Sequence, residues 1–315
     1  MNNSIYWKRK NEMKETAIRH TAEMKSFFSE ETQNSIKKSE FIDYSDHDAY
    51  MESIKPIEFG EGPTNIIIMK GTTVEAIQRY RNEPKLASLN FASYKNPGGK
   101  FIEGSMAQEE SLCHSSNLYN ILSSDRCMKE FYKPNKNRTN KCLYEDTLIY
   151  TPGVVFDQTP TSQSNIEPIK TRCAVITCAA PNATAAKKYY GVSKKDISLA
   201  LFWRIHSVLL CARDHKIKTL ILGAFGCGVF GNDIVEVANT FSFFLNTEFR
   251  NTFDTVIFAI PELYDGDRSY DIFEDAFNAT DRMIINDRQK RYKESCIFKD
   301  GILKDMDIDE LNNEE

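Results

Sequence analysis

The sequence lacks the marks of membrane, secreted and duplex-binding proteins. No apolar run approaches the roughly 20 residues that cross a bilayer as a helix. Met1 to Arg9 is polar and holds no apolar stretch of a secretion signal. The net charge of -5 offers no basic field to duplex nucleic acid. We therefore expect a cytoplasmic monomer, or a nuclear one if the source is eukaryotic, with no membrane or duplex nucleic acid as partner.

Cysteine is present, but without the spacing of a disulfide framework or a zinc site. None of the eight cysteines forms a C-x-x-C pair. Several lie in apolar runs, and we see no cluster of metal-ligand residues. This pattern indicates reduced, mostly buried thiols in an intracellular protein. The eight positions are Cys113, Cys127, Cys142, Cys173, Cys178, Cys211, Cys227 and Cys296.

Strands and helices are expected to alternate along the chain. Apolar, β-rich runs predict strands at 64–69, 86–91, 174–178, 220–222 and 255–260. Helical patterns cover 73–80, 111–122, 193–215 and 233–245. Two short strands, 148–150 and 154–156, should flank a turn at Pro152-Gly153, before a surface loop at 157–168. Because several strands are apolar throughout, we expect both faces of the sheet to be covered, as in a three-layer α/β sandwich.

The two ends of the chain differ from this middle part. Residues 8–36 have the spacing of an amphipathic helix, so residues 1–60 are predicted to form a helical extension packed on the core. The core itself is expected to span 61–278. Residues 279–315 are rich in acids and predicted to form a charged tail. The 41% apolar content is sufficient for a sizeable core.

A glycine loop follows the strand predicted at 220–222. Gly226, Gly228 and Gly231 lie between this strand and a helix, where successive backbone N–H groups can form a nest for an anion. The helix N-terminus should add its dipole, so diphosphate is the expected guest. The spacing also matches the dinucleotide fingerprint, but Asp254 and Glu262 are misplaced for the acid which that fold requires. Glycines needed only for packing are the remaining alternative.

Another segment joins a short strand, a glycine turn and two adjacent acids. The strand 86–91 leads into Gly98-Gly99, and Glu109-Glu110 follows where a helix starts. Glycine lets a backbone approach a ligand closely. Carboxylates at the opening of a helix lie near unpaired N–H groups. A phosphate or sugar ligand and a general acid could therefore share one small volume. The alternative is a solvated helix start, where acids are common.

Three blocks together resemble the microbial type of poly(ADP-ribose) glycohydrolase, a branch of the macrodomain superfamily. Leu89 to Ser111 is similar to the family's three glycines followed by Gln-Glu-Glu. Ile176 to Ala183 is similar to its strand leading to Ala-Pro-Asn, and Leu222 to Asn232 to its diphosphate loop. The resemblance extends from about residue 8 to 278 and implies a macrodomain-like fold with a mixed central sheet. One position departs, because Lys100 stands where the family has its third glycine.

The resemblance implies a glycosidase that cleaves ribose–ribose O-glycosidic bonds of poly(ADP-ribose) and releases ADP-ribose. Glu110 would be the general acid/base, and Glu109 would orient the leaving ribose. Asn96 would bind the hydroxyls of the distal ribose, and Phe230 would pack on that sugar. The implied ligands are ADP-ribose, its polymer and ADP-ribosylated proteins, with no cofactor and no metal. The other substrate-binding residues implied are Gly98, Gly99, Lys100, Gln108, Asn182, Gly226, Cys227, Gly228, Val229, Gly231 and Asn232.

Other functions remain open from the sequence. An ADP-ribose-binding module without turnover would share the pocket but would not need Glu110. A hydrolase of a smaller derivative, such as ADP-ribose 1″-phosphate or a mono-ADP-ribosyl linkage, would fit if Lys100 and the 157–168 loop reshape the rim. Lys100 either strains the turn, if its position requires φ > 0, or reaches the phosphates. Cys113-His114 is a poor nucleophilic pair on a helix, and His206 is predicted to be a packing residue.

Overall fold

The computed structural model of the chain describes residues 3–46, 62–158 and 169–278. Most of the surface loop predicted at 157–168 lies outside these residues, as does the acidic tail 279–315. Residues 1–277 form one compact unit, and the sheet and the candidate site belong to it.

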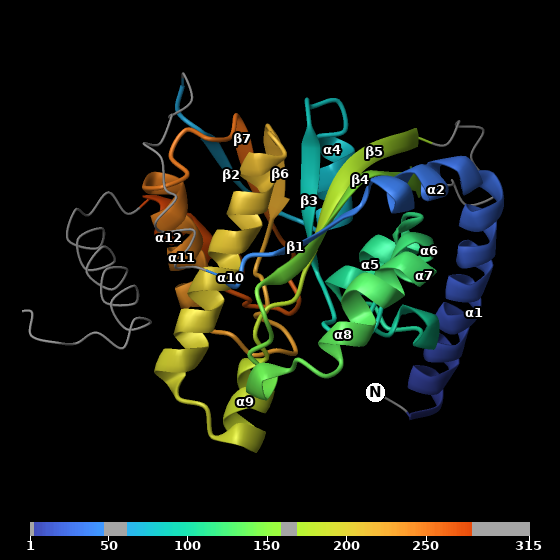
Figure 1. The fold of residues 1–315 in the computed structure, drawn as a ribbon, viewed down its shortest axis with the longest axis horizontal. Helices are drawn as coiled ribbons and strands as arrows, with labels where there is room; N and C mark the ends of the chain where they lie inside the picture. Colours follow the sequence, from blue (N-terminus) through green and yellow to red (C-terminus); the bar gives the residue numbers. More distant parts are fainter. Residues whose placement is uncertain (1–2, 47–61, 159–168, 279–315) are drawn as a thin grey trace, which may run out of the picture. The chain divides into compact units, whose positions relative to one another are not determined.

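A seven-stranded sheet with the order β1-β4-β5-β3-β6-β7-β2 forms the centre of this unit (Figure 1). The last five strands in that order are parallel, whereas β4 is antiparallel to β5 and β1 is antiparallel to β4. The predicted mixed sheet is therefore confirmed. The strands are β1 (Glu40–Asp43), β2 (Asn65–Lys70), β3 (Leu86–Phe91), β4 (Thr147–Gln158), β5 (Ile169–Cys178), β6 (Thr219–Leu222) and β7 (Thr255–Ile260).

Helices cover both faces of the sheet, as the apolar strands predicted. Along β7, Ile257 joins the core formed with the helices α1, α4, α5 and α6. The next residue, Phe258, packs on Phe241 and Phe273 of helices on the other face. The α-helices are α1 (Asn3–Phe27), α2 (Ser29–Lys38), α4 (Thr73–Arg79), α5 (Gln108–His114), α6 (Leu118–Leu122), α7 (Asp125–Cys127), α8 (Lys133–Asn135), α9 (Ala183–Tyr190), α10 (Lys194–Asp214), α11 (Ile234–Asn246) and α12 (Ser269–Asn278). Shorter turns are η1 (Phe101–Glu103), η2 (Met128–Tyr132) and η3 (Asn140–Cys142).

The two short strands predicted around Pro152-Gly153 are one strand, β4. Its register against β5 shifts between Thr151 and Val154, so this dipeptide forms a bulge and not a turn. A bulge tolerates proline, which has no N–H to donate, and glycine, which here has φ +71°. β4 also continues to Gln158, and thus includes the first two residues of the predicted loop.

The single helix predicted at 111–122 is two helices, and the first begins earlier, at Gln108. The break lies at Ser116-Asn117, where the backbone N–H of Asn117 donates to the carbonyl of Val155 (3.1 Å). The Asn117 side-chain carbonyl accepts from the N–H of Val155 (2.9 Å). These bonds to β4 replace the helical ones. They depend on a strand distant in sequence, so the local pattern did not indicate them.

The N-terminal segment packs on the core and also adds a strand to it. The helix predicted at 8–36 breaks at the buried Phe28 into α1 and α2. Phe28 packs with Met24 and Val155. α1 also passes so close to Gly104 that a Cβ there would lie 2.5 Å from the Lys10 carbonyl oxygen. None of the helices described is long and apolar enough to cross a membrane.

Candidate active site

The carboxyl ends of three neighbouring parallel strands bring the predicted motifs to one edge of the sheet. β3 lies between β5 and β6, and Phe91 at its end is paired with Cys178 at the end of β5. The loop after β6 contacts the end of β3 through the rings of Phe91 and Phe225, whose centroids lie 5.5 Å apart. Open α/β sheets bind ligands at this kind of edge. The glycine turn, the acidic pair and the glycine loop therefore border one site.

Gln108 fixes the start of α5 against the end of β3. Its side-chain carbonyl accepts from the N–H of Phe91 (2.8 Å). Its amide group donates to the Leu89 carbonyl (2.8 Å) and to the Thr73 hydroxyl (3.1 Å). Gln108 was expected among the substrate-binding residues, but these bonds occupy its amide. We infer that it positions the two carboxylates that follow it.

Glu109 is held in a buried polar network and is only 3% exposed. One carboxylate oxygen accepts from the backbone N–H of Ser93 (2.7 Å), and the other accepts from the Asn90 side chain (3.3 Å). Burial raises the pKa of Glu109 to about 8, although these hydrogen bonds favour the charged form. Desolvation therefore outweighs hydrogen bonding, and a large fraction of Glu109 is protonated near neutral pH.

Glu110 is 7% exposed and has a simpler environment. Its Oε1 accepts a hydrogen bond from the backbone N–H of Lys100 (2.9 Å). Its other oxygen accepts no hydrogen bond from the residues that the structure describes. One oxygen is thus anchored to the glycine turn, and the second remains available to a ligand or a water molecule.

The glycine turn can approach the carboxylates only because it has no side chains at two positions. Gly98 and Gly99 have φ +65° and +60°. A Cβ on Gly99 would lie 2.6 Å from Glu110 Oε1, and one on Gly98 would lie 2.7 Å from the Tyr119 ring. Lys100, in contrast, has φ -111°. This position needs no left-handed backbone, so strain in the turn, one of the two alternatives that the sequence left open for Lys100, is ruled out. Asn96, in the same turn, is exposed.

The glycine loop after β6 presents three backbone N–H groups at its tip. Among the described residues, the N–H groups of Gly228, Val229 and Phe230 have no protein acceptor. The side chain of Val229 is 86% exposed, so the tip faces solvent. Successive free N–H groups of this kind form an anion-binding nest. Cys227 lies beside the nest, and burial raises the pKa of its thiol to about 12.

Three residues of the glycine loop itself fix its conformation: Gly226, Gly231 and Asn232. Gly226 has φ +73°, and a Cβ there would lie 2.5 Å from both Ala180 and Asn232. The Asn232 amide donates to the carbonyls of Pro181 (2.8 Å) and Gly226 (3.0 Å). Gly231 packs against Thr184 with φ +68°. Asn232 was expected to bind substrate, but its amide N–H groups are committed to the loop itself.

The helix after the glycine loop is already capped. Asp233 accepts hydrogen bonds from the N–H groups of Val235 (2.9 Å) and Glu236 (3.4 Å) at the start of α11. The sequence predicted that this helix N-terminus would help to bind the diphosphate. Two N–H groups of this helix start are therefore already bound by the Asp233 carboxylate, and the free amides at the loop tip offer an anion further donors.

An aromatic cluster lines the site beside the glycine loop. The rings of Tyr94 and Tyr144 are stacked with centroids 4.3 Å apart, and Phe230 lies 6.2 Å from Tyr144. Phe230 is half-buried, so part of its ring remains exposed. Asn182 caps α9, because its side-chain oxygen accepts from the N–H of Ala185 (2.9 Å). The sequence analysis missed both tyrosines, since Tyr94 is marked only by its place just before the glycine turn and Tyr144 has no local signal.

Arg204 of α10, only 1% exposed, holds two loops of the site together. Its guanidinium pairs with Asp146 (2.7 Å) and donates to the carbonyls of Ala179 and Leu143. The sequence analysis did not single it out, although an arginine within an apolar helix is a signal of buried pairing. His206, two residues further along α10, is buried, which confirms the predicted packing role, and its ring is also hydrogen-bonded to Glu248 (3.0 Å).

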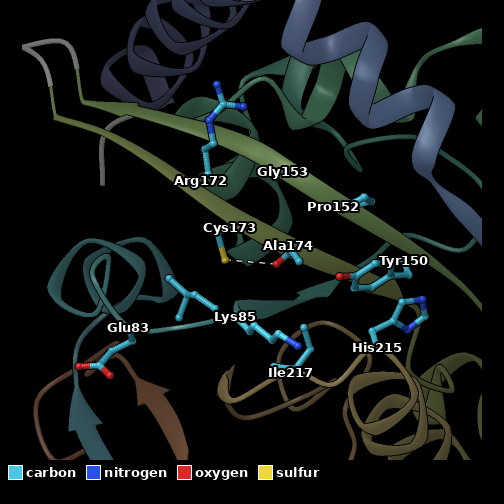
Figure 2. A pocket seen from close by; sticks show the side chains of 11 residues that line it. Glu83, Lys85, Tyr150, Pro152, Gly153, Arg172, Cys173, Ala174, His215 and Ile217 are labelled. Carbon is cyan, nitrogen blue, oxygen red and sulfur yellow. Dashed lines mark hydrogen bonds between the residues drawn. The ribbon is translucent and has the colours of Figure 1, made fainter.

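A hollow of about 360 Å³ lies at the opposite edge of the sheet (Figure 2). It is lined by Lys85, which precedes β3, and Ile217, which precedes β6. Tyr150 and His215 stack beside each other there, with ring centroids 3.6 Å apart. None of the predicted site residues reaches it. A second hollow, of about 620 Å³, borders the glycine loop at Gly231 and contacts α9 and α10.

Comparisons with known proteins agree with this arrangement. The family model for the catalytic domain of microbial-type poly(ADP-ribose) glycohydrolase matches residues 10–158. The crystal structure of this enzyme from Thermomonospora curvata has a TM-score of 0.75 and 30% identity, and the match covers 85% of this chain and 100% of that one. The same enzyme bound to the inhibitor ADP-HPD gives a TM-score of 0.72, 30% identity and coverages of 84% and 98%.

A relative from a second bacterium has been solved with a ligand. The poly(ADP-ribose) glycohydrolase of Deinococcus radiodurans in complex with ADP-ribose has a TM-score of 0.69 and 30% identity, and the match covers 79% of this chain and 98% of that one. A comparison with curated protein sequences finds no match. These likenesses confirm the predicted macrodomain-like fold.

Proposed function

Because this chain belongs to the microbial-type poly(ADP-ribose) glycohydrolase family and is a glycosidase, we propose that it cleaves the ribose–ribose bonds of poly(ADP-ribose) with Glu110 as acid and base. The observation that carries the proposal is the placement of Glu110. Its free carboxylate oxygen lies at the same sheet edge as the three free amides of the glycine loop. An ADP-ribose ligand presents a sugar and a diphosphate, and these two groups correspond to the two halves of the site.

Glu110 would deliver a proton to the oxygen that leaves the anomeric carbon. Positive charge builds on that carbon as the C–O bond breaks, and the carboxylate then takes a proton from the attacking water. The water oxygen joins the anomeric carbon, and the proton returns to Glu110 for the next cycle. The N–H of Lys100 holds Oε1, so Oε2 is the oxygen that faces the reaction.

Glu109 would bind the hydroxyls of the leaving ribose. With its pKa raised to about 8, the carboxyl group carries a proton in a large fraction of molecules near neutral pH and can donate as well as accept. Adjacent side chains on a helix diverge by about 100°, so Glu109 and Glu110 address different groups of the substrate. This separates orientation of the sugar from proton transfer.

The remaining contacts would hold the diphosphate and the distal ribose. The free N–H groups of Gly228, Val229 and Phe230 would bind the phosphate oxygens. The exposed part of the Phe230 ring would pack on the distal ribose, and the exposed Asn96 would bind its hydroxyls. Lys100, exposed beside Gly99, would add charge at the phosphates.

The test compares wild type with Glu110→Gln on purified poly(ADP-ribose), with the products separated by chromatography. Wild type should release ADP-ribose, and the variant should be slower by roughly 10²- to 10⁴-fold, as expected for loss of a general acid. Both proteins should be stabilised by ADP-ribose, since the substitution keeps the pocket. Glu103→Gln, which changes an exposed carboxylate of η1, is the matched control and should keep full activity. Unchanged turnover in Glu110→Gln would overturn the assignment.

Lys100 also favours a second candidate, hydrolysis of ADP-ribose 1″-phosphate. The backbone of Lys100 lies next to Glu110, because its N–H binds that carboxylate, and its side chain is exposed. A phosphate on the anomeric carbon would place its charge in the same region. Release of phosphate from this compound, without release of ADP-ribose from the polymer, would favour the second candidate over the first.

A further inference from the structure

One segment beside the site is strongly basic in a protein that is acidic overall. Residues 129–141 carry five cationic side chains and one acid, in a chain of net charge -5. All five cations are exposed. We refer to these five residues as the basic rim: Lys129, Lys133, Lys136, Arg138 and Lys141.

This segment is held in place by contacts with residues that border the site. The ring of Phe131 lies 6.2 Å from that of Tyr94. The neighbouring Tyr132 is buried, and its pKa is raised first by that burial and then by the charge of Glu109. At the other end, the Cys142 carbonyl accepts from the N–H of Asn182 (2.9 Å). The segment therefore borders the site on the side of the acidic pair, and Figure 1 shows α8 between α5 and α9.

Most cations of the basic rim form no ion pair with a described residue. Lys133, Lys136 and Lys141 form no ion pair with a described residue. Lys129 lies 3.6 Å from its neighbour Glu130, and Arg138 acts on Glu145 only through its field. Among the described residues, internal ion pairing therefore does not account for four of the five charges.

The backbone next to the rim is held in an unfavourable conformation. Asn140, Lys141 and Cys142 have φ +42°, +51° and +68°, a left-handed region that non-glycine residues avoid. Strain of this kind persists where the surrounding structure enforces it, and it often marks functional segments. The turn keeps Lys141 exposed at the edge of the site at a conformational cost.

We propose that the basic rim binds the phosphates of the polymer beyond the unit being cleaved, so that long chains are preferred over short ones. This inference rests on the proposed function, and it adds a group of residues that makes the enzyme prefer long polymer chains. The terminal unit would occupy the glycine loops, and the leaving chain would extend from the acidic pair. Each further unit carries a diphosphate, and a polyanion bound by several cations releases counterions, which makes binding salt-dependent.

The test removes three rim charges together in the Lys133→Gln, Lys136→Gln, Arg138→Gln variant. Its matched control is Lys37→Gln, Lys85→Gln, Lys216→Gln, which changes three exposed lysines elsewhere on the chain. We expect KM for long poly(ADP-ribose) to rise about tenfold or more and KM for the ADP-ribose dimer, which has one diphosphate beyond the cleaved unit, to rise much less, with kcat unchanged. The slope of log KM against log salt should fall by about 2, at roughly 0.7 for each lost contact.

Binding measurements separate this proposal from the proposed function. The dissociation constant for labelled long polymer is measured in the Glu110→Gln background, with and without the three rim substitutions, and for ADP-ribose alone. Weaker polymer binding with unchanged ADP-ribose binding supports the rim, even if wild type hydrolyses nothing. Equal loss on polymer and ADP-ribose, or no loss on either, overturns it. A wild type that binds polymer without cleaving it overturns only the hydrolase assignment.

Discussion

Two adjacent carboxyl groups on α5 differ because their surroundings differ. Glu109 is enclosed by donors from β3 and the following turn, and burial dominates its protonation. Glu110 is fixed at one oxygen only, by the N–H of Lys100. The sequence predicted both residues at a helix start, since acids and glycines are local signals. It could not predict the donors, because Asn90 and Ser93 reach Glu109 only after β3 and α5 pack together.

At this scale the glycine turn supports a sharp prediction. In Gly99→Ala the new Cβ would lie 2.6 Å from Glu110 Oε1, at a position with φ +60°. Either the turn or the carboxylate must move, so we expect kcat to fall at least tenfold and the protein to lose about 1–2 kcal/mol of stability. The measurements are steady-state kinetics on poly(ADP-ribose) and unfolding in denaturant. Gly191→Ala is the control and should keep kcat, because Gly191 has a similar φ of +61° but nothing lies within 4 Å of a Cβ there. A fully active Gly99→Ala would contradict the tight fit.

Elements with a continuous apolar character were predicted well. The strands β2, β3, β6 and β7 lie within a residue or two of their expected positions, since buried parallel strands are apolar on both faces. Elements whose position depends on residues distant in the sequence were predicted poorly. β1 has only four residues and is defined by its pairing with β4. α5 and α6 are separated by bonds from Asn117 to β4, and α9 and α12 were missed.

Arg204 shows how one helix stabilises the loops around it. Arg204→Met removes the buried cation that lies 2.7 Å from Asp146, and with it the donors to the carbonyls of Ala179 and Leu143. We expect a loss of about 3–5 kcal/mol in the free energy of unfolding, as for other broken buried pairs. Arg172→Met removes an exposed arginine that lies 3.3 Å from Glu31, and should cost at most about 1 kcal/mol. Equal losses in the free energy of unfolding of the two variants would show that burial does not make the Arg204 ion pair more important for stability than the exposed one.

The whole molecule assembles its site from segments far apart in the sequence. The acidic pair follows β3, the Pro-Asn motif follows β5, and the amide nest follows β6. The strand order places these three ends side by side. The N-terminal segment contributes to the same assembly, because β1 completes one edge of the sheet and α1 contacts Gly104 near the glycine turn.

Stability of the whole ligand-free molecule should decrease as the pH rises from about 4.5 to 8. The folded state binds the Glu109 proton with a pKa of about 8, whereas the unfolded chain has an ordinary value near 4.5. Between these values the unfolded state releases a proton that the folded state retains, so unfolding becomes easier by a few kcal/mol at most. Below pH 4.5 Glu109 is protonated in both the folded and the unfolded state, so its contribution to the free energy of unfolding no longer changes with pH.

The check is the free energy of unfolding in denaturant from pH 4 to 9. Glu109→Gln removes the titrating group and should flatten the profile in this window. Glu103→Gln leaves Glu109 in place and should keep the wild-type profile. If wild type and Glu109→Gln showed parallel profiles, Glu109 would not be the group that couples folding to protons.

The sequence by itself determined the family and the fold class of this protein. Glycines that need positive φ, acids at a helix start and apolar parallel strands are local choices of residue, so they can be recognised without coordinates. Only the tertiary structure decided how these residues divide the work. It committed Gln108, Asn182 and Asn232 to the scaffold, left Lys100 unstrained and raised the pKa of Glu109. Those outcomes depend on burial and on hydrogen bonds between distant segments, which arise only when the strands pair.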